Sequence, residues 1–138
     1  MAIRNVVESG KTQVLVGLPI KGATTINQGE IVAKDNVTGY VEVGSVATGK
    51  TCMGLAPKTF DNSTGADGAA TASSVYGGDY VAMENSTGAD KVLSTDLFST
   101  VYINGANKVS RLSAGKSAAG KCVGFEPNGD VRVLVLPF

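Results

Sequence analysis

The chain has 138 residues, with 12 lysines and arginines, 12 aspartates and glutamates, and neither histidine nor tryptophan. This length suits one domain that buries its core without metal ions or disulfide bonds as supports. Because the charges balance, no basic field is present to hold phosphate backbones, and we expect no nucleic-acid partner. No apolar run approaches the length needed to span a bilayer, so we expect no membrane partner.

The composition predicts an all-β fold. The 18 glycines occur among abundant Thr, Ser, Val and Ala, and hardly any stretch suits a helix of more than two turns. We expect residues 1–10 to form an N-terminal arm. Residues 11–138 should form a single small β-barrel or jelly-roll-like domain built from repeated hairpins. The segment after Met1 has no apolar signal core, which predicts synthesis in a cytosol.

Several hairpins are predicted in chain order, after a first strand at Thr12–Leu18. Each consists of alternating or apolar residues on both sides of a cluster of turn residues, and the four lie at Gly29–Val43, Gly78–Leu93, Val101–Leu112 and Cys122–Leu136. The least apolar stretch, Lys58–Ser74, is predicted to be a surface loop.

Two of these hairpins are copies of one phrase. Aligned without a gap, GEIVAKDNVTGYVEV at residues 29–43 and GDYVAMENSTGADKVL at residues 78–93 share their glycines, their Asn-x-Thr-Gly turn and the Val-Ala pair of the first strand. Self-similarity of this kind indicates one supersecondary unit used more than once within a core. We therefore expect Gly39 and Gly88 to occupy turn positions with positive φ.

A second repeat contains both cysteines. Gly49-Lys50 is followed by Cys52-Met53-Gly54, and Gly120-Lys121 is followed by Cys122-Val123-Gly124. Each cysteine lies beside an apolar residue and a glycine, which predicts buried free thiols in a reducing compartment. A disulfide between the two copies is the alternative. A catalytic thiol is disfavoured because the chain has no histidine to act as its base.

Residues 44–51, GSVATGKT, match the phosphate-binding P-loop pattern, but their context argues against nucleotide binding. The mechanism requires this loop to open a helix, whose N-terminal amides hold the phosphates. Gly54 and Pro57 cannot sustain a helix there, and the second Gly-Lys copy lacks the hydroxyl residue that binds magnesium. We expect no nucleotide, and we expect Lys50 to be an exposed residue whose replacement barely changes stability.

The remaining polar motifs are interpreted as turn chemistry. The Asn-x-Thr sequences at Asn36, Asn62 and Asn85 would be glycosylation acceptors only in a secreted chain. The paired carboxylates, such as Asp61 with Asp67, lack the dense spacing of a calcium loop. We therefore predict no catalytic residues, no metal site and no cofactor, and hence a protein that is not an enzyme.

Glycine and valine spacings over nearly the whole chain carry a family resemblance. The residues concerned are Gly29–Val32, Gly54, Leu55, Gly78–Val81, Lys91, Val92, Ala119–Gly124 and Asp130–Val135. In these positions the chain resembles the small capsid decoration (cement) proteins of tailed bacteriophages. The loop Lys58–Ser74 departs from that pattern.

The resemblance implies a structural virion protein without enzymatic activity. It would lie on the outer surface of an icosahedral head as a homo-oligomer, either a trimer or a dimer, and stabilise the capsid by joining neighbouring subunits of the major capsid protein. The alternative is a carbohydrate- or receptor-binding β module of a phage tail or fibre. That alternative calls for exposed aromatic platforms, and the chain has only four Tyr and four Phe.

The apolar chain ends are the predicted contact residues. Apolar side chains near a terminus are costly to leave in water, so a neighbouring subunit or the shell should cover them. The predicted capsid or oligomer contacts are Ile3, Val6, Val7, Leu136, Pro137 and Phe138.

Overall fold

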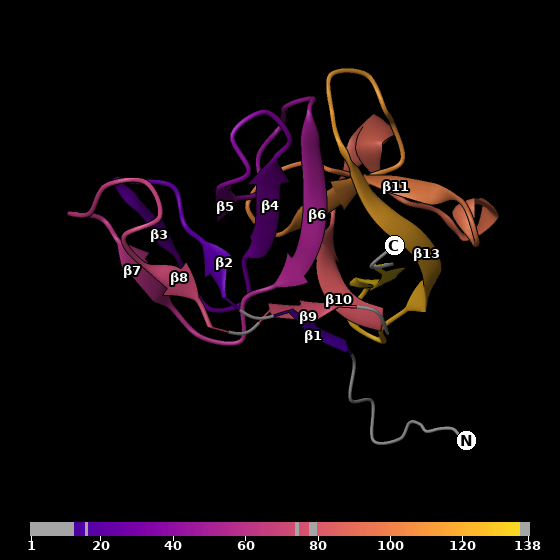
Figure 1. Cartoon of the computed structure of the whole chain (residues 1–138). Helices are drawn as coiled ribbons and strands as arrows, with labels where there is room; N and C mark the ends of the chain where they lie inside the picture. The colour runs from indigo at the N-terminus through magenta and orange to yellow at the C-terminus, as the bar shows by residue number, and fades with distance from the viewer. Residues whose placement is uncertain (1–12, 16, 74, 78–79, 136–138) are drawn as a thin grey trace.

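The computed structural model describes residues 13–15, 17–73, 75–77 and 80–135, and this part of the chain is almost entirely β-structure, as predicted (Figure 1). The strands of the N-terminal half are β1 Gln13–Leu15, β2 Leu18–Pro19, β3 Thr24–Ile26, β4 Ile31–Asp35, β5 Val41–Val43, β6 Lys50–Leu55, β7 Phe60–Asn62, β8 Thr71–Ala72 and β9 Val75–Gly77. The C-terminal half contains β10 Tyr80–Asn85, β11 Thr100–Ile103, β12 Lys108–Ser110, β13 Ala118–Phe125 and β14 Val131–Leu134, with two short 3-10 helices, η2 Gly88–Asp90 and η3 Ser94–Asp96.

A closed five-stranded barrel forms the C-terminal half, in the order β10-β12-β11-β13-β14. The β10–β12 pair is parallel, and the other four pairs are antiparallel. Closure leaves no free edge around the ring, which removes the pairing liability of an open sheet. The sequence prediction of a barrel is therefore confirmed for this half of the chain.

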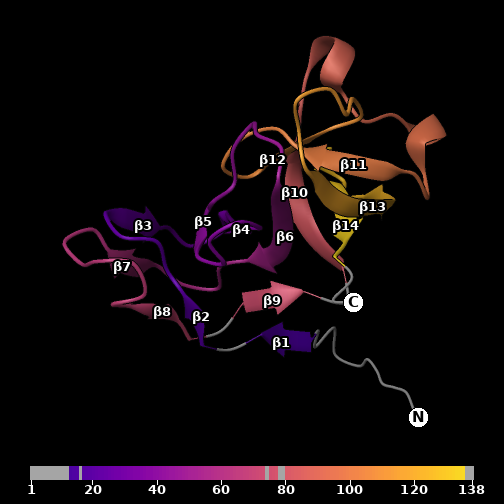
Figure 2. The ribbon, with the colours of Figure 1, turned by 45° about the horizontal axis from the view of Figure 1, so that its top comes forward.

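The N-terminal half forms an open sheet with two small ribbons beside it (Figure 2). The sheet has the order β1-β9-β6-β4-β5, and the ribbons pair β2 with β8 and β3 with β7. The predicted strand over residues 12–18 is interrupted, because Gly17 has φ of +69° and separates β1 from β2. Residues 1–10, predicted to be an arm, lie outside the described residues.

Strand β4 lies between two hydrophobic cores, and this explains why its first three residues, Ile31–Ala33, are all apolar. Ile31 and Ala33 pack in the barrel core with Val101, Ile103 and other barrel residues. Val32, on the opposite face, packs in the second core, which belongs to the N-terminal sheets. Because successive strand residues point to opposite faces, a strand buried on both sides needs apolar residues at every position. The backbone N–H of Ile31 also donates to the carbonyl of Ala106, in the β11–β12 turn.

The Cys-x-Gly repeat is a β-bulge used twice. On β6 the register with β4 shifts at Met53, and on β13 the register with β14 shifts at Val123. In both copies the glycine has strongly positive φ, +129° at Gly54 and +152° at Gly124. An extra residue at a bulge bends the strand, and glycine accommodates the backbone there. The repeat thus encodes a bulge in β6 and an equivalent bulge in β13.

Three of the predicted hairpins are confirmed, and one is wrong. Antiparallel pairs β4–β5, β11–β12 and β13–β14 form the first, third and terminal hairpins. In the second copy, residues 91–93 form no strand, and β10 pairs instead with β14 and β12. The Asn85 side chain accepts the N–H of Val92 at 2.9 Å and donates to its carbonyl, so the returning chain bonds to a side chain.

The two turn glycines have positive φ angles, as predicted, with values of +82° at Gly39 and +65° at Gly88. Only Gly39 lies in a hairpin turn, whereas Gly88 begins η2. The prediction for Lys58–Ser74 is wrong in part, because this stretch contains β7 and β8. Buried Asn62 donates to the carbonyls of Ile20, Lys21 and Ala66, which ties the stretch to β2 and its following turn.

Candidate interaction surface

The residues predicted to contact a capsid or a second copy cannot be placed. Ile3, Val6, Val7, Leu136, Pro137 and Phe138 all lie outside the described residues. Their role stays a prediction. Any surface defined by the structure must therefore come from other residues.

Four exposed apolar side chains lie in the η3 segment or in the segment that Asp96 bonds to it. Leu93 is 44% exposed, Leu97 is 41%, Phe98 is 75%, and Leu112, which follows β12, is 40%. We call these four residues the barrel patch. The η3 segment is part of the barrel half, on the side away from β7 and β8 (Figures 1 and 2). Exposed large apolar residues that adjoin one another mark interaction sites more often than scattered ones do.

Asp96 holds the two segments of the barrel patch together. Its carboxylate accepts the backbone N–H of Leu93 at 2.7 Å and two guanidinium N–H groups of Arg111, at 3.0 and 3.3 Å. The bonds from Arg111 and then from Leu93 hold the pKa of Asp96 below its ordinary value. Arg111 directly precedes Leu112, so this two-pronged pair fixes Leu112 beside the η3 segment.

Phe98 has a strained backbone and an exposed ring. Its φ is +66°, in the left-handed region that bulky residues avoid. Two hydrogen bonds to β13 fix this backbone conformation. The N–H of Phe98 donates to the carbonyl of Cys122 at 2.7 Å, and the N–H of Cys122 donates to the carbonyl of Ser99 at 3.0 Å. Strained residues persist only where the surroundings fix them, and they concentrate at functional sites.

The charges around the barrel patch leave a basic rim. The two carboxylates in segments 86–100 and 110–122, Asp90 and Asp96, are paired with Lys116 and Arg111. Lys91 and Lys121 are exposed, and neither has an ion pair within the described part of the chain. The unpaired charged side chains of these two segments are therefore both positive.

Sequence reasoning missed this patch. The predicted hairpins place Leu93 and Leu112 in strands, and the sequence analysis gives Leu97 and Phe98 no role. The available signal was the pair Leu97-Phe98, two large apolar residues in a segment otherwise made of Ser, Thr and Asp, which fits neither a strand alternation nor a turn.

Residues 44–51 do not form a phosphate-binding loop. Strand β6 begins at Lys50, so the lysine opens a strand where the motif requires a helix. The Lys50 ammonium bonds to Glu42 and, at 3.3 Å, to Asp35. The expectation that Lys50 is exposed is wrong, because its side chain is only 14% exposed. Its N–H also donates to Ser117 Oγ, which in turn donates to the carbonyl of Ala47.

The prediction of buried free thiols is confirmed for both cysteines. Burial raises the pKa of Cys52 to about 12, and burial is also the main cause that raises the pKa of Cys122. Thiols with raised pKa values are poor nucleophiles. Among the described residues, no three His, Cys, Asp or Glu side chains lie together as metal ligands.

Comparisons with protein-family models, with curated proteins and with solved structures each gave no match. The resemblance to decoration proteins therefore depends on the glycine and valine positions of the chain itself. No helix in the described ranges is both long and apolar enough to span a membrane.

Proposed function

We propose that the chain is a non-enzymatic structural protein that decorates the outer surface of a phage head and joins neighbouring major capsid subunits. The observation that carries the proposal is the strained, exposed Phe98 of the barrel patch. The sequence resemblance supplies the identity of the partner. The geometry supplies a surface suited to binding another protein.

The patch has the properties of an interface anchor. Aromatic residues fixed before binding contribute most to interfaces, because little conformational freedom is lost when they dock. Burying the four patch side chains, at about 25 cal/mol per Å² of apolar area, supplies several kcal/mol before the costs of association. A single contact of this size is modest, and attachment through several copies of a homo-oligomer would strengthen it.

The rim predicts the chemistry of the partner surface. Lys91 and Lys121 favour an apolar depression bordered by carboxylates on the capsid protein. Exposed charges are screened by salt, so the association rate should fall as ionic strength rises. The apolar contact with Phe98 should persist at high salt.

The test is saturation binding to purified expanded heads of the phage that encodes the chain. Phe98→Gly removes the ring and suits the positive φ, so the protein stays folded. We expect at least about a tenfold loss of affinity, equivalent to about 1.4 kcal/mol. Val37→Ser is the matched control, because Val37 is 92% exposed but lies in the β4–β5 turn. Failure of the unaltered chain to bind heads, or equal binding by Phe98→Gly, would contradict the proposal.

A further inference from the structure

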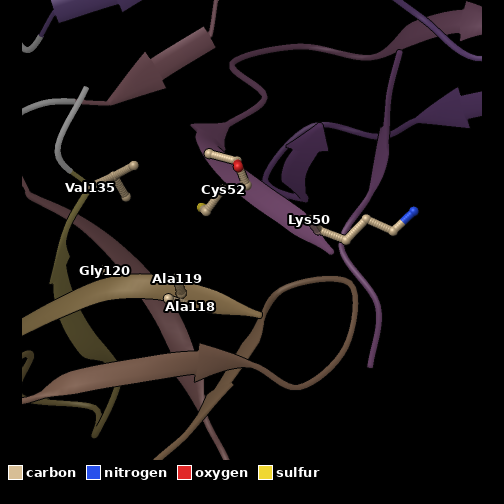
Figure 3. A pocket seen from close by; sticks show the side chains of 7 residues that line it. Lys50, Cys52, Ala118, Ala119, Gly120 and Val135 are labelled. Atoms are coloured by element: carbon tan, nitrogen blue, oxygen red, sulfur yellow. The ribbon is translucent and has the colours of Figure 1, made fainter. Parts of the chain in front are cut away.

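Strand β13 begins against the N-terminal sheet and ends in a turn at the surface. Its first residues, Ala118–Gly120, line a small pocket together with Cys52 of β6 (Figure 3). Its last residue, Phe125, leads into the turn that connects β13 to β14, and this turn contains the dipeptide Asn128-Gly129. The sequence contains Asn-Gly twice, and the other copy is Asn104-Gly105 in the β11–β12 turn.

Asparagine followed by glycine can deamidate without an enzyme, and the reaction needs only water. The glycine nitrogen loses its proton to solvent and bonds to Cγ of the asparagine, and the Cγ–Nδ2 bond breaks as ammonia leaves. Water then opens the cyclic succinimide at either carbonyl, which gives aspartate or isoaspartate. Glycine favours the attack because it has no Cβ to obstruct its nitrogen.

The turn holds Asn128 in a geometry that assists this attack. Its Oδ1 accepts the N–H of Asp130 at 2.9 Å, and this oxygen gains negative charge when Cγ is attacked, so the N–H stabilises the intermediate. Among the described residues, the partner of its Nδ2 is Asp130 Oδ2 at 3.4 Å, near the limit of a hydrogen bond. The Gly129 N–H must first leave the Glu126 carbonyl. Pro127, Asn128 and Gly129 are exposed, so this local opening costs little.

Asn104 is held much more firmly, although its dipeptide is the same. Its Nδ2 donates to Ser86 Oγ at 2.9 Å, and its N–H donates to the carbonyl of Lys108 at 2.9 Å. Ser86 is only 6% exposed, and its Oγ in turn donates to the carbonyl of Val109. Moving the Asn104 amide would leave the buried Ser86 oxygen without this donor, which is costly.

We propose that Asn128 is a site of spontaneous deamidation, whereas the fold protects Asn104. The reaction adds one negative charge to a chain whose formal charges balance. In the isoaspartate product the backbone gains a methylene group between Glu126 and Asp130, where the N–H of Glu126 now donates to the carbonyl of Asp130 at 2.8 Å. Aged protein should therefore be more acidic and have an altered β13–β14 turn. The proposal is independent of capsid binding.

Peptide mass mapping of the full chain tests the proposal, after incubation at mildly alkaline pH under conditions where the protein stays folded. Asn128 should react at least about tenfold faster than Asn104 and give both aspartate and isoaspartate. In urea, where the chain is unfolded, the two sites should react at similar rates because the dipeptide is the same. Similar rates in the folded protein, or the same excess at Asn128 in urea, would overturn the proposal.

A substitution at Ser86 tests the cause of the protection. Ser86→Ala should raise the rate at Asn104 by at least about threefold and leave the rate at Asn128 unchanged, because it removes the acceptor of the Asn104 amide. Thr87→Ala is the control, since Thr87 is exposed and makes no side-chain capping bond to η2. An unchanged rate at Asn104, or an equal rise at both asparagines, would count against the proposal.

Discussion

Replacing Lys50 with alanine should destabilise the protein, although the sequence suggests an exposed and dispensable lysine. The ammonium group lies between Asp35 and Glu42. The side chains of Lys50, Asp35 and Glu42 are 14%, 30% and 19% exposed. Glu42 retains Lys21 at 3.6 Å after the replacement, but Asp35 loses its partner.

The expected loss lies between two limits. Exposed ion pairs contribute about 0–1 kcal/mol, and breaking a fully buried pair costs about 3–5 kcal/mol. Because this network is mostly but not fully covered, we expect Lys50→Ala to lower the free energy of unfolding by about 1–2 kcal/mol. Lys50→Met should lose nearly as much, since it keeps the aliphatic stem and removes only the charge.

Urea unfolding of matched variants measures this effect. Lys121 occupies the equivalent Gly-Lys position of the repeat and is exposed, so Lys121→Ala should change stability by no more than about 0.5 kcal/mol. The N–H groups of Val37 and Thr38, followed by Lys50, lower the pKa of Asp35 below 3.8. Its stabilising effect is therefore present above pH 3.8 and is lost as pH falls through the lowered pKa. Equal stabilities of Lys50→Ala and Lys121→Ala near neutral pH would show that the Lys50 ion pairs do not stabilise the fold.

Three further results are expected. Gly120→Ala should lower the free energy of unfolding, measured in urea, by at least about 2 kcal/mol more than Gly49→Ala does. An added Cβ at Gly120 would lie 2.3 Å from the Leu134 carbonyl oxygen, whereas an added Cβ at Gly49 would have no heavy atom within 4 Å. Asp96 has a lowered pKa, so its contribution to stability is present above pH 3.8 and is lost as pH falls through its lowered pKa. In a pH series of thermal melts, Asp96→Asn should remove this part of the acid sensitivity. Phe98→Gly should leave the free energy of unfolding unchanged or raise it by up to about 1 kcal/mol. Relief of the backbone strain at residue 98 offsets the greater conformational freedom of glycine in the unfolded chain. A clear loss of stability would mean that the Phe98 ring is part of the core.

Much of the fold could be predicted from local chemistry. The apolar run at Ile31–Ala33 and the turn at Gly39 lie in a hairpin whose partner strands are close in sequence, so pattern and turn signals act together. The same holds for β11–β12 and β13–β14. The two bulges, in contrast, appear in the sequence only as a repeated Cys-x-Gly phrase, and nothing local shows that the extra residue is unpaired.

Failures occurred where long-range contacts decided the outcome. Residues 78–93 repeat the first hairpin closely, yet β10 takes its partners from β12 and β14, and Asn85 bonds to the returning backbone in place of a strand. Lys58–Ser74 is polar, but Phe60 and Asn62 become buried by pairing with β3. The pair Leu97-Phe98 stands out in the sequence, but only the folded structure shows that both side chains are exposed.

We propose that this chain binds the outside of a phage head through the barrel patch. Cryo-electron microscopy of heads saturated with the protein would locate the chain and orient its barrel. We expect the barrel half on the outer shell, with Phe98 in an apolar depression of the major capsid protein and Lys91 and Lys121 near carboxylates. Density for this chain on a tail or fibre, or on the head with Phe98 facing solvent, would contradict it.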